Sequence, residues 1–157
     1  MAAAEWWFYH IEHTSLDAAI APLIEKCLDR KWRVVVVGHD DTLERLNKTL
    51  WSFREDSFLP HGRARTDADK HPVLLSTEAV ATNGAKVALL LDGSDVADAS
   101  FERVMVVFDG GDETARAKAR QQYQAATDGG AARYFQQERG GAWKEFKRAE
   151  TSAPPQD

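Results

Sequence analysis

Four consecutive valines at 34–37 constrain the fold of this chain more than any other feature. They follow Trp32 and Arg33 and end at Gly38, and no polar residue alternates with them. An uninterrupted β-branched run is typical of a strand that is covered on both faces, as in parallel sheets with helices on each side. The run therefore predicts a parallel sheet at the centre of the fold.

Other strand-like segments recur along the chain, and helical patterns lie between them. The strand-like segments are 6–11, which is rich in aromatic residues, 73–76, 86–91, 103–108 and 133–137. Apolar residues repeat at helical spacing over 16–27 and 43–50, and a longer helix is predicted over 113–126, before the glycines at 129–130. This alternation predicts an α/β fold, a three-layer sandwich with a mostly parallel sheet and helices on both faces.

Capping residues set the predicted helix starts. The candidate N-caps are Thr14 or Ser15 for the first helix, Asp40 or Asp41 for the second and Asp112 for the third. Pro22 conflicts with an uninterrupted first helix, because its ring removes a backbone donor. We therefore expect a kink at Pro22 or a helix that starts near Ala21.

The 157 residues are enough for one domain with its own core, since a fold of this size buries roughly 70% of its extended-chain surface. We expect a single α/β domain over 1–148. Residues 149–157 are polar, contain two prolines and are predicted to be a disordered tail. Residues 52–72 lack a periodic pattern and are predicted to form a long loop, of the kind that is often functional.

Composition excludes several classes of function. The chain has 25 acidic and 20 basic residues, and this net charge of −5 excludes a generic nucleic-acid coat. The single Cys27 excludes a cysteine zinc site and an intrachain disulfide, and we expect it to be a packed small hydrophobe. No apolar run approaches the roughly 20 residues of a membrane span, and the first residues lack a secretory signal. We therefore expect a cytoplasmic protein without membrane contact.

Charge is unevenly distributed along the chain. The segment 113–148 holds eight basic and four acidic residues, a net +4, so the remainder carries −9. A basic segment on an acidic body favours one local anion-binding surface, although a solvated helix face is the plainer interpretation.

Motifs for nucleotide chemistry are missing from the chain. Neither GxGxxG nor GxxxxGK[ST] occurs, and the turn after the valine run is Gly38, His39, Asp40, Asp41. One glycine, no lysine and two acids make that turn a poor cradle for phosphate. The enzyme alternative is a small nucleotide- or metal-dependent α/β enzyme that uses this 38–41 turn. No cofactor and no catalytic residue is predicted.

His10 and His13 are spaced like a pair of metal ligands. No third ligand lies near them in sequence beyond Glu12, so ordinary polar contacts are the favoured interpretation.

The final predicted helix carries the strongest candidate site. At 100° per residue, Arg116, Arg120 and Tyr123 fall within about 60° of one another. A neighbouring stripe of small residues can pack on the sheet: Ala115, Ala119 and Ala126. Two guanidinium groups beside an aromatic ring suit a short peptide with carboxylates and an apolar end. The alternative is that both arginines pair with acids of their own domain and that Tyr123 belongs to the core.

Two further aromatic groups suggest interaction surfaces. Trp51, Phe53 and Phe58 lie in a polar stretch, where they either fold back on the core or await an apolar partner. The aromatic residues of the basic C-terminal third, Tyr134, Phe135 and Trp143, give a weaker hypothesis of direct single-strand binding, against which the acidic net charge counts.

Several of these segments resemble a known family, the chi subunit of the bacterial DNA polymerase III holoenzyme. The resemblance runs over nearly the whole chain, and its most specific part is Leu50-Trp51 followed by Ser57-Phe58-Leu59-Pro60-His61. Supporting segments are Phe8-Tyr9, Lys31-Trp32-Arg33, Phe101-Glu102-Arg103-Val104 and Ala119-Arg120-Gln121-Gln122-Tyr123.

The resemblance implies a non-catalytic adaptor with a nucleotide-binding-like fold and no phosphate loop. Chi-like proteins pair with the psi subunit of the clamp loader and bind the acidic, phenylalanine-terminated tail of single-stranded-DNA-binding protein, so contact with DNA is only indirect. Carried over, the tail site is Arg116, Arg120 and Tyr123. The psi interface is Trp51, Phe58, Leu59 and Pro60.

One position departs from the family pattern. The residue after the tyrosine, basic in the best-known member, is Gln124 here. Either a charge contact is missing, or Lys118 or another C-terminal basic residue replaces it.

Overall fold

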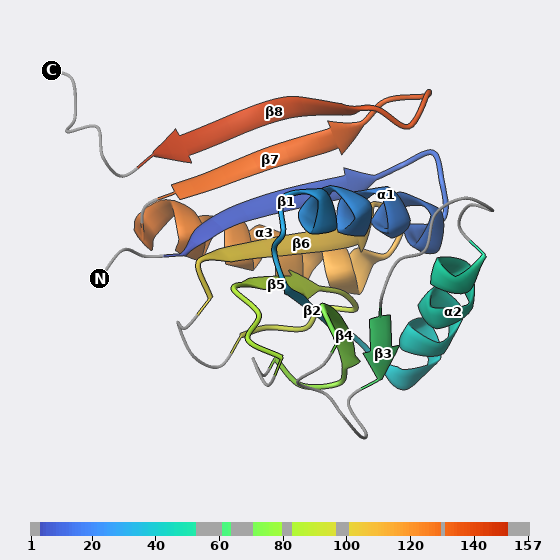
Figure 1. Ribbon diagram of the computed structural model, residues 1–157. Helices are drawn as coiled ribbons and strands as arrows, with labels where there is room; N and C mark the ends of the chain where they lie inside the picture. The colour runs from blue at the N-terminus through green and yellow to red at the C-terminus, as the bar shows by residue number, and fades with distance from the viewer. Residues whose placement is uncertain are drawn as a thin grey trace, which may run out of the picture.

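The molecule is built around one eight-stranded sheet (Figure 1). The computed structural model describes residues 4–52, 61–63, 71–79, 83–96, 101–129 and 131–150. The strands are β1 Glu5–Ile11, β2 Val34–Val37, β3 His61–Arg63, β4 Val73–Ser76, β5 Val87–Leu90, β6 Arg103–Asp109, β7 Ala131–Gln137 and β8 Trp143–Glu150. Their order in the sheet is β3-β4-β2-β5-β6-β1-β7-β8, and every neighbouring pair is parallel except the β7–β8 hairpin.

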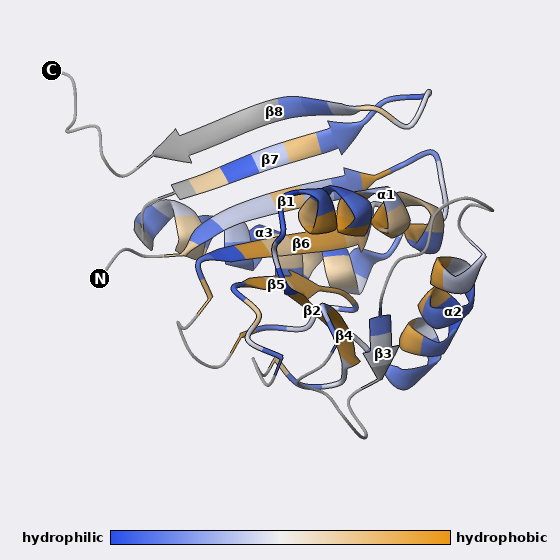
Figure 2. Cartoon of the chain, in the orientation of Figure 1, coloured by the Kyte–Doolittle hydropathy of each residue, from blue (hydrophilic) through white to orange (hydrophobic). Residues whose placement is uncertain are grey.

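Helices lie on both faces of the sheet, as Figure 1 shows. Helices α1 Leu16–Asp29 and α2 Asp40–Trp51 share one apolar cluster with one face, and α3 Glu113–Gly129 packs on the other. The valine run divides between the two clusters, with Val34 and Val36 in the first and Val35 and Val37 in the second. In Figure 2 the orange, hydrophobic residues gather on the central strands and on the helix sides that face them. The predicted three-layer sandwich is confirmed.

The first strand runs through the middle of the sheet and serves both faces. It pairs in parallel with β6 on one side and β7 on the other, with Trp7 opposite both Met105 and Arg133. Side chains of a strand alternate between faces. Trp7 and Tyr9 therefore pack on the α1 side, whereas Phe8 packs on the α3 side.

Two of the predicted helix starts are confirmed, and one is wrong in detail. The Ser15 hydroxyl accepts a hydrogen bond from the Ala18 N–H (3.2 Å), and an Asp112 carboxylate oxygen accepts one from the Ala115 N–H (3.1 Å). At α2 the N-cap is His39, without a side-chain hydrogen bond. The predicted caps Asp40 and Asp41 lie instead in the first turn, where their charge favours the positive end of the helix.

Helix α1 starts at Leu16 and not near Ala21, with Pro22 inside it. The missing donor is tolerated because the helix buries a continuous apolar face around the proline, including Ile20, Leu23 and Ile24.

Two strands lie outside the sequence predictions. The edge strand β3 occupies three residues of the region expected to be a loop at 52–72. At the other edge, the strand over 133–137 is followed by a further strand, because the chain turns at Gly141 (φ +88°) and returns as β8. That strand reaches Glu150, past the domain end expected at 148, while 151–157 lie outside the described residues.

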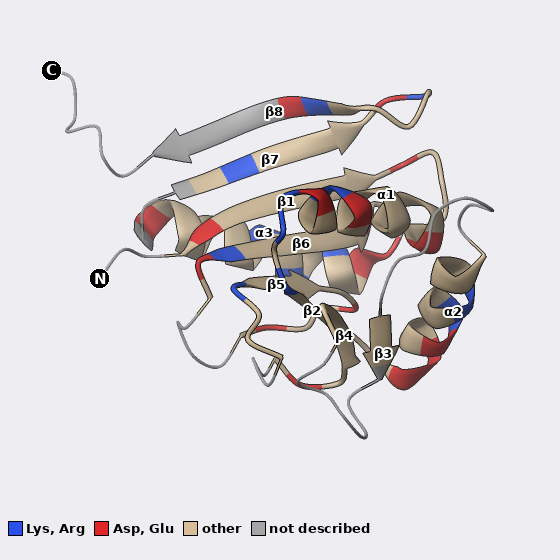
Figure 3. Cartoon of the chain, viewed as in Figure 1, with Lys and Arg blue, Asp and Glu red and all other residues tan. Residues whose placement is uncertain are grey.

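Within the described ranges, no helix is both long and apolar enough to cross a membrane. Figure 3 shows basic and acidic residues interspersed over the helices, with blue and red together on α1 and on α2.

Candidate functional site

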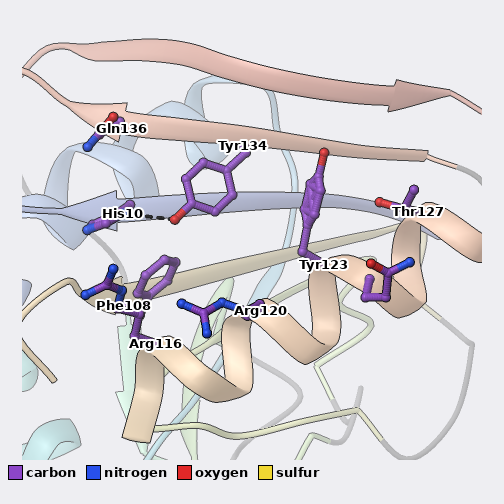
Figure 4. A pocket seen from close by; sticks show the side chains of 9 residues that line it. His10, Phe108, Arg116, Arg120, Tyr123, Thr127, Tyr134 and Gln136 are labelled. Carbon is purple, nitrogen blue, oxygen red and sulfur yellow. Dashed lines mark hydrogen bonds between the residues drawn. The ribbon is translucent and has the colours of Figure 1, made fainter. Parts of the chain in front are cut away.

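A pocket of about 440 Å³ lies between α3 and the strands β1 and β7 (Figure 4). We call it the α3 pocket. Its lining residues come from β1, β6, α3 and β7: His10, Phe108, Arg116, Arg120, Tyr123, Gln124, Thr127, Tyr134 and Gln136. All three residues of the predicted constellation, Arg116, Arg120 and Tyr123, therefore line the same pocket.

The small-residue stripe of α3 sets the position of this pocket. Ala115, Ala119 and Ala126 are buried against the sheet, as their spacing predicts, and Ala119 has no exposed surface. Because alanine allows close approach, the next residues around the helix lie directly above β1 and β7. Figure 4 shows Arg116 and Arg120 projecting from α3 toward the Tyr134 side of the pocket.

The two arginines give the pocket its charge. Both side chains are exposed, and neither forms an ion pair with a carboxylate of the described residues. Guanidinium groups present several N–H donors in one plane and bind carboxylates in a bidentate manner. The pocket therefore offers two cationic groups one helical turn apart at its mouth.

Aromatic rings form the apolar part of the pocket. The Tyr123 ring lies 5.5 Å from the Phe8 ring and 5.8 Å from the Tyr134 ring, measured between centroids. The Phe108 ring lies 6.2 Å from that of Tyr134. Tyr123 is partly buried, so it belongs both to the edge of the core and to the wall of the pocket. This combination of aromatic wall and cationic mouth fits an anionic ligand with an apolar group.

His10 occupies the end of the pocket near Arg116. Its Nδ1 lies 2.9 Å from the Tyr134 hydroxyl and its Nε2 lies 3.3 Å from a carboxylate oxygen of Glu12. Burial lowers the pKa of the His10 imidazole below 6.5. Glu12 opposes this shift, and Arg116 adds to it. His10 thus makes polar contacts within the pocket, which is the interpretation that the sequence favours over a metal site.

The Tyr134 hydroxyl is also shielded. Burial raises its pKa above the usual 10, while Arg116 and Arg120 oppose the shift. The phenol therefore stays protonated and can donate or accept a hydrogen bond at neutral pH.

The position that departs from the family pattern lies in the pocket. The Gln124 side-chain N–H donates to an Asp128 carboxylate oxygen (3.2 Å). Lys118 does not line the pocket, because its ammonium group pairs with Asp95 (3.1 Å), so it does not replace the missing charge. Thr127 adds a buried hydroxyl without a hydrogen-bond partner among the described residues.

The second predicted surface is described only at Trp51. Its side chain, at the end of α2, is 59% exposed, and its ring lies 4.9 Å from the His61 ring of β3. The other predicted members of this surface, Phe58, Leu59 and Pro60, lie outside the described residues.

The 38–41 turn, on which the enzyme alternative depends, is dominated by acids. The His39 backbone N–H donates to a carboxylate oxygen of Asp92 (2.8 Å), and that oxygen lies close to Gly38. Asp92 thus adds a third carboxylate beside Asp40 and Asp41 and makes the turn still less suited to phosphate. Among the described side chains, no group of three or more His, Cys, Asp or Glu residues is arranged to hold a metal ion.

Comparison with known families decides the class of protein. Residues 3–133 match the family model described as DNA polymerase III chi subunit, HolC. The chain belongs to the DNA polymerase III chi subunit family. A similar curated protein is the "Probable DNA polymerase III subunit chi" of Rickettsia prowazekii (strain Madrid E), which is 29% identical over 111 residues, covering 64% of this chain and 67% of that protein.

Membership of the chi subunit family associates the chain with DNA replication, as an accessory subunit of a polymerase. All of the residues that α3 contributes to the pocket lie inside the matched region. Tyr134 and Gln136 lie just beyond it.

Sequence reasoning missed the strand side of the α3 pocket. The sequence suggests ordinary polar contacts or a metal pair for His10 and a nucleic-acid contact for Tyr134, and it singles out neither Phe108 nor Gln136. The period-two alternation of 6–11 and 133–137 would have placed His10 and Tyr134 on faces of their strands, but nothing local shows that β1 and β7 are neighbours.

Proposed function

We propose that this chi-family protein is a non-catalytic adaptor of the replication machinery. One surface, the α3 pocket, receives the acidic, phenylalanine-terminated tail of single-stranded-DNA-binding protein. A second surface, around Trp51, contacts a psi-type subunit of the clamp loader. The observation that carries the proposal is the meeting, in one pocket, of an aromatic wall and two arginines that form no ion pair with a described carboxylate.

The chemistry of the pocket suits such a tail. Arg116 and Arg120 bind the carboxylates, including the terminal one, while the terminal phenylalanine ring packs against Tyr123 and Phe108. The Tyr134 hydroxyl adds a neutral hydrogen-bonding group beside the two cations. A neutral or basic peptide would leave both guanidinium groups without partners, so the pocket selects for acidic ends.

The expected affinity is moderate. Charge-assisted hydrogen bonds contribute about 1.5–3 kcal/mol each, and burial of one aromatic side chain contributes a similar amount. After the cost of ordering the peptide, this gives a dissociation constant of about a micromolar, weakened by salt. Because single-stranded-DNA-binding protein presents many tails on a coated strand, attachment is strengthened by their number.

The decisive experiment is a titration with a synthetic peptide that ends in several acidic residues and a C-terminal phenylalanine. We expect Arg120→Glu to weaken binding at least about tenfold, since it replaces an attraction with a repulsion. Arg139→Glu is the matched control, because Arg139 is an exposed arginine in the β7–β8 turn, outside the pocket. Equal binding by Arg120→Glu and the wild type would refute the site.

The second surface is tested separately. Trp51→Asp and Phe58→Asp should each reduce co-purification with a psi-type subunit while leaving the peptide titration unchanged. The exposure of Trp51 makes the first substitution compatible with folding. Loss of both activities in either variant would indicate unfolding and not a broken interface.

A further inference from the structure

A second pocket, of about 310 Å³, lies on the opposite face of the sheet from the α3 pocket. We call it the α1 pocket. The residues on which its chemistry depends are Trp7 and Tyr9 of β1, Lys26 and Arg30 at the end of α1, Trp32, and Trp143 of β8. Nothing in the role proposed above uses this pocket.

Rings of the α1 pocket stack against guanidinium groups, those of Arg30 and Arg133 in the pocket lining and that of Arg103 outside it. Arg103 lies over Trp7 (4.1 Å from Cζ to the ring centroid) and over Trp32 (4.5 Å). Arg133 lies over Trp7 (4.9 Å) on one side and Phe135 (5.0 Å) on the other, and Arg30 lies 5.0 Å from Trp32. Since stacking fixes the planes of these groups, their N–H donors point outward from the stack in set directions.

Two of these arginines, Arg133 and Arg103, already have acidic partners. Arg133 donates to the two carboxylate oxygens of Glu145 (2.7 and 3.2 Å), and Arg103 pairs with Glu5 (3.5 Å). Even so, the Nε and Nη1 donors of Arg103 are buried without a hydrogen-bond partner among the described residues. An unpaired buried donor is costly, but Arg103 is not among the residues that line the pocket, so these donors do not define its ligand.

The outer cations have no acidic partner within the described ranges. Lys26 and Arg30 are exposed and form no ion pair there. They lie four residues apart on α1, so their side chains extend from the same helix face along one edge of the pocket. Three cations line the pocket, Lys26, Arg30 and Arg133. Because Arg133 is paired with Glu145, two positive charges are left over.

The arrangement repeats that of the α3 pocket on the other side of β1 and β7. In each case a helix or its C-cap supplies two basic residues four positions apart. Successive residues of the same strands face opposite sides of the sheet and supply the two aromatic walls, Tyr134 on one face and Phe135 on the other. A ligand that covers the partly exposed Trp7, Trp32 and Trp143 would gain binding free energy from burial of apolar surface, in addition to that from charge neutralisation.

We infer that the α1 pocket binds an acidic peptide segment of a partner protein, with one aromatic or large apolar side chain inserted beside Trp143 and carboxylates paired with Lys26 and Arg30. The pocket is small, at the lower end of the range for ligand sites, so it holds one or two side chains. Single-stranded nucleic acid fits less well, because its backbone requires an extended basic groove and most of this chain is acidic.

The test uses the full chain and a blocked peptide of acidic residues around one phenylalanine, acetylated and amidated so that it has no terminal carboxylate. Binding is followed by the indole N–H resonances in proton–nitrogen correlation spectra, assigned with Trp7→Phe, Trp32→Phe and Trp143→Phe. The peptide should shift the Trp7, Trp32 or Trp143 resonance. The double variant Lys26→Glu, Arg30→Glu should weaken this response at least about tenfold.

Two controls separate this inference from the proposed function. Lys48→Glu makes one such charge reversal at an exposed lysine of α2 and should bind normally, and Arg120→Glu should leave the indole shifts intact. The inference is overturned if no indole of the pocket responds, if the Lys26 and Arg30 double variant binds normally, or if Arg120→Glu alone abolishes the shifts. Tighter binding of an oligothymidylate than of the peptide, lost in the same double variant, would overturn it in favour of nucleic acid.

Discussion

The Nδ1 atom of His10 lies 2.9 Å from the hydroxyl oxygen of Tyr134, so one hydrogen bond joins β1 to β7 inside the α3 pocket. The two residues are 124 positions apart in the chain. On its other side the imidazole faces Glu12, with Asp109 and Arg116 near enough to influence its charge. The protonation of His10 therefore links the stability of the sheet to the electrostatics of the pocket.

Acidification should destabilise the protein through His10. Its pKa in the folded state is lowered below 6.5, mainly by burial, so between that lowered value and 6.5 the unfolded chain binds a proton that the native state does not. The free energy of unfolding falls as pH decreases through this interval, and above 6.5 the effect is absent. In urea denaturation, the stability difference between the wild type and His10→Gln should narrow over the same interval. A difference that stays constant down to pH 5 would contradict this.

Gly110→Ala should cost about 1–3 kcal/mol of stability through a clash with His10. A Cβ at position 110 would meet the Nε2 of the imidazole and lie 3.2 Å from the Ile11 carbonyl oxygen. The measurement is a double-mutant cycle by chemical denaturation with His10→Ala, which removes the ring and should recover part of the loss. Additive losses would mean that the ring is not what excludes a side chain from position 110.

Substitution of Gln137 should destabilise the protein as much as substitution of a core residue. Its side-chain oxygen accepts hydrogen bonds from the backbone N–H groups of Glu12, His13 and Thr14 (3.1, 2.8 and 3.3 Å). The residue is only 3% exposed. Gln137→Leu leaves these donors unpaired and should cost about 1–3 kcal/mol in thermal or urea unfolding. Gln137→Glu keeps the acceptor and should cost less. Equal losses in both variants would assign the effect to the side-chain N–H group, which donates to the Thr14 hydroxyl (2.9 Å) and which neither variant keeps.

Cys27 should be unreactive in the native protein. The residue is 1% exposed, and burial raises the pKa of its thiol from 9.0 to about 11. Two pKa units reduce the thiolate fraction at pH 8 about a hundredfold, before any steric protection. A disulfide reagent should label the unfolded chain in urea at once. In buffer without urea, the labelling rate should be limited by the rate at which the native structure opens. Rapid stoichiometric labelling of the folded chain would show that the α1 pocket admits the reagent.

Local patterns were enough to predict much of the fold and the α3 side of the candidate site. The valine run, with neither face polar, requires a covered parallel strand, and β2 is buried at all four positions. Helical periodicity is likewise local, so the face shared by Arg116, Arg120 and Tyr123 follows from spacing. The three buried alanines then fix that face at the border of the sheet.

The rest depends on strand neighbours that no local pattern specifies. His10 and Tyr134 meet only because β1 pairs with β7, and Trp7 lies between Arg103 and Arg133 for the same reason. The predicted single-strand surface is divided by this arrangement, since Tyr134 faces α3 while Phe135 and Trp143 face α1. Asn83 likewise is buried and donates to the carbonyl oxygens of Val34 and His71, which lie far from it in the sequence.

The central position of β1 has a consequence for how the chain is made. Its neighbours are β6 and β7, and the first paired residues, Glu5 and Arg103, are separated by 98 positions. During translation the most aromatic segment of the protein therefore leaves the ribosome long before either neighbouring strand exists. Such distant contacts slow folding and leave apolar surface exposed meanwhile. Strand β1 is paired on both sides only when synthesis is almost finished.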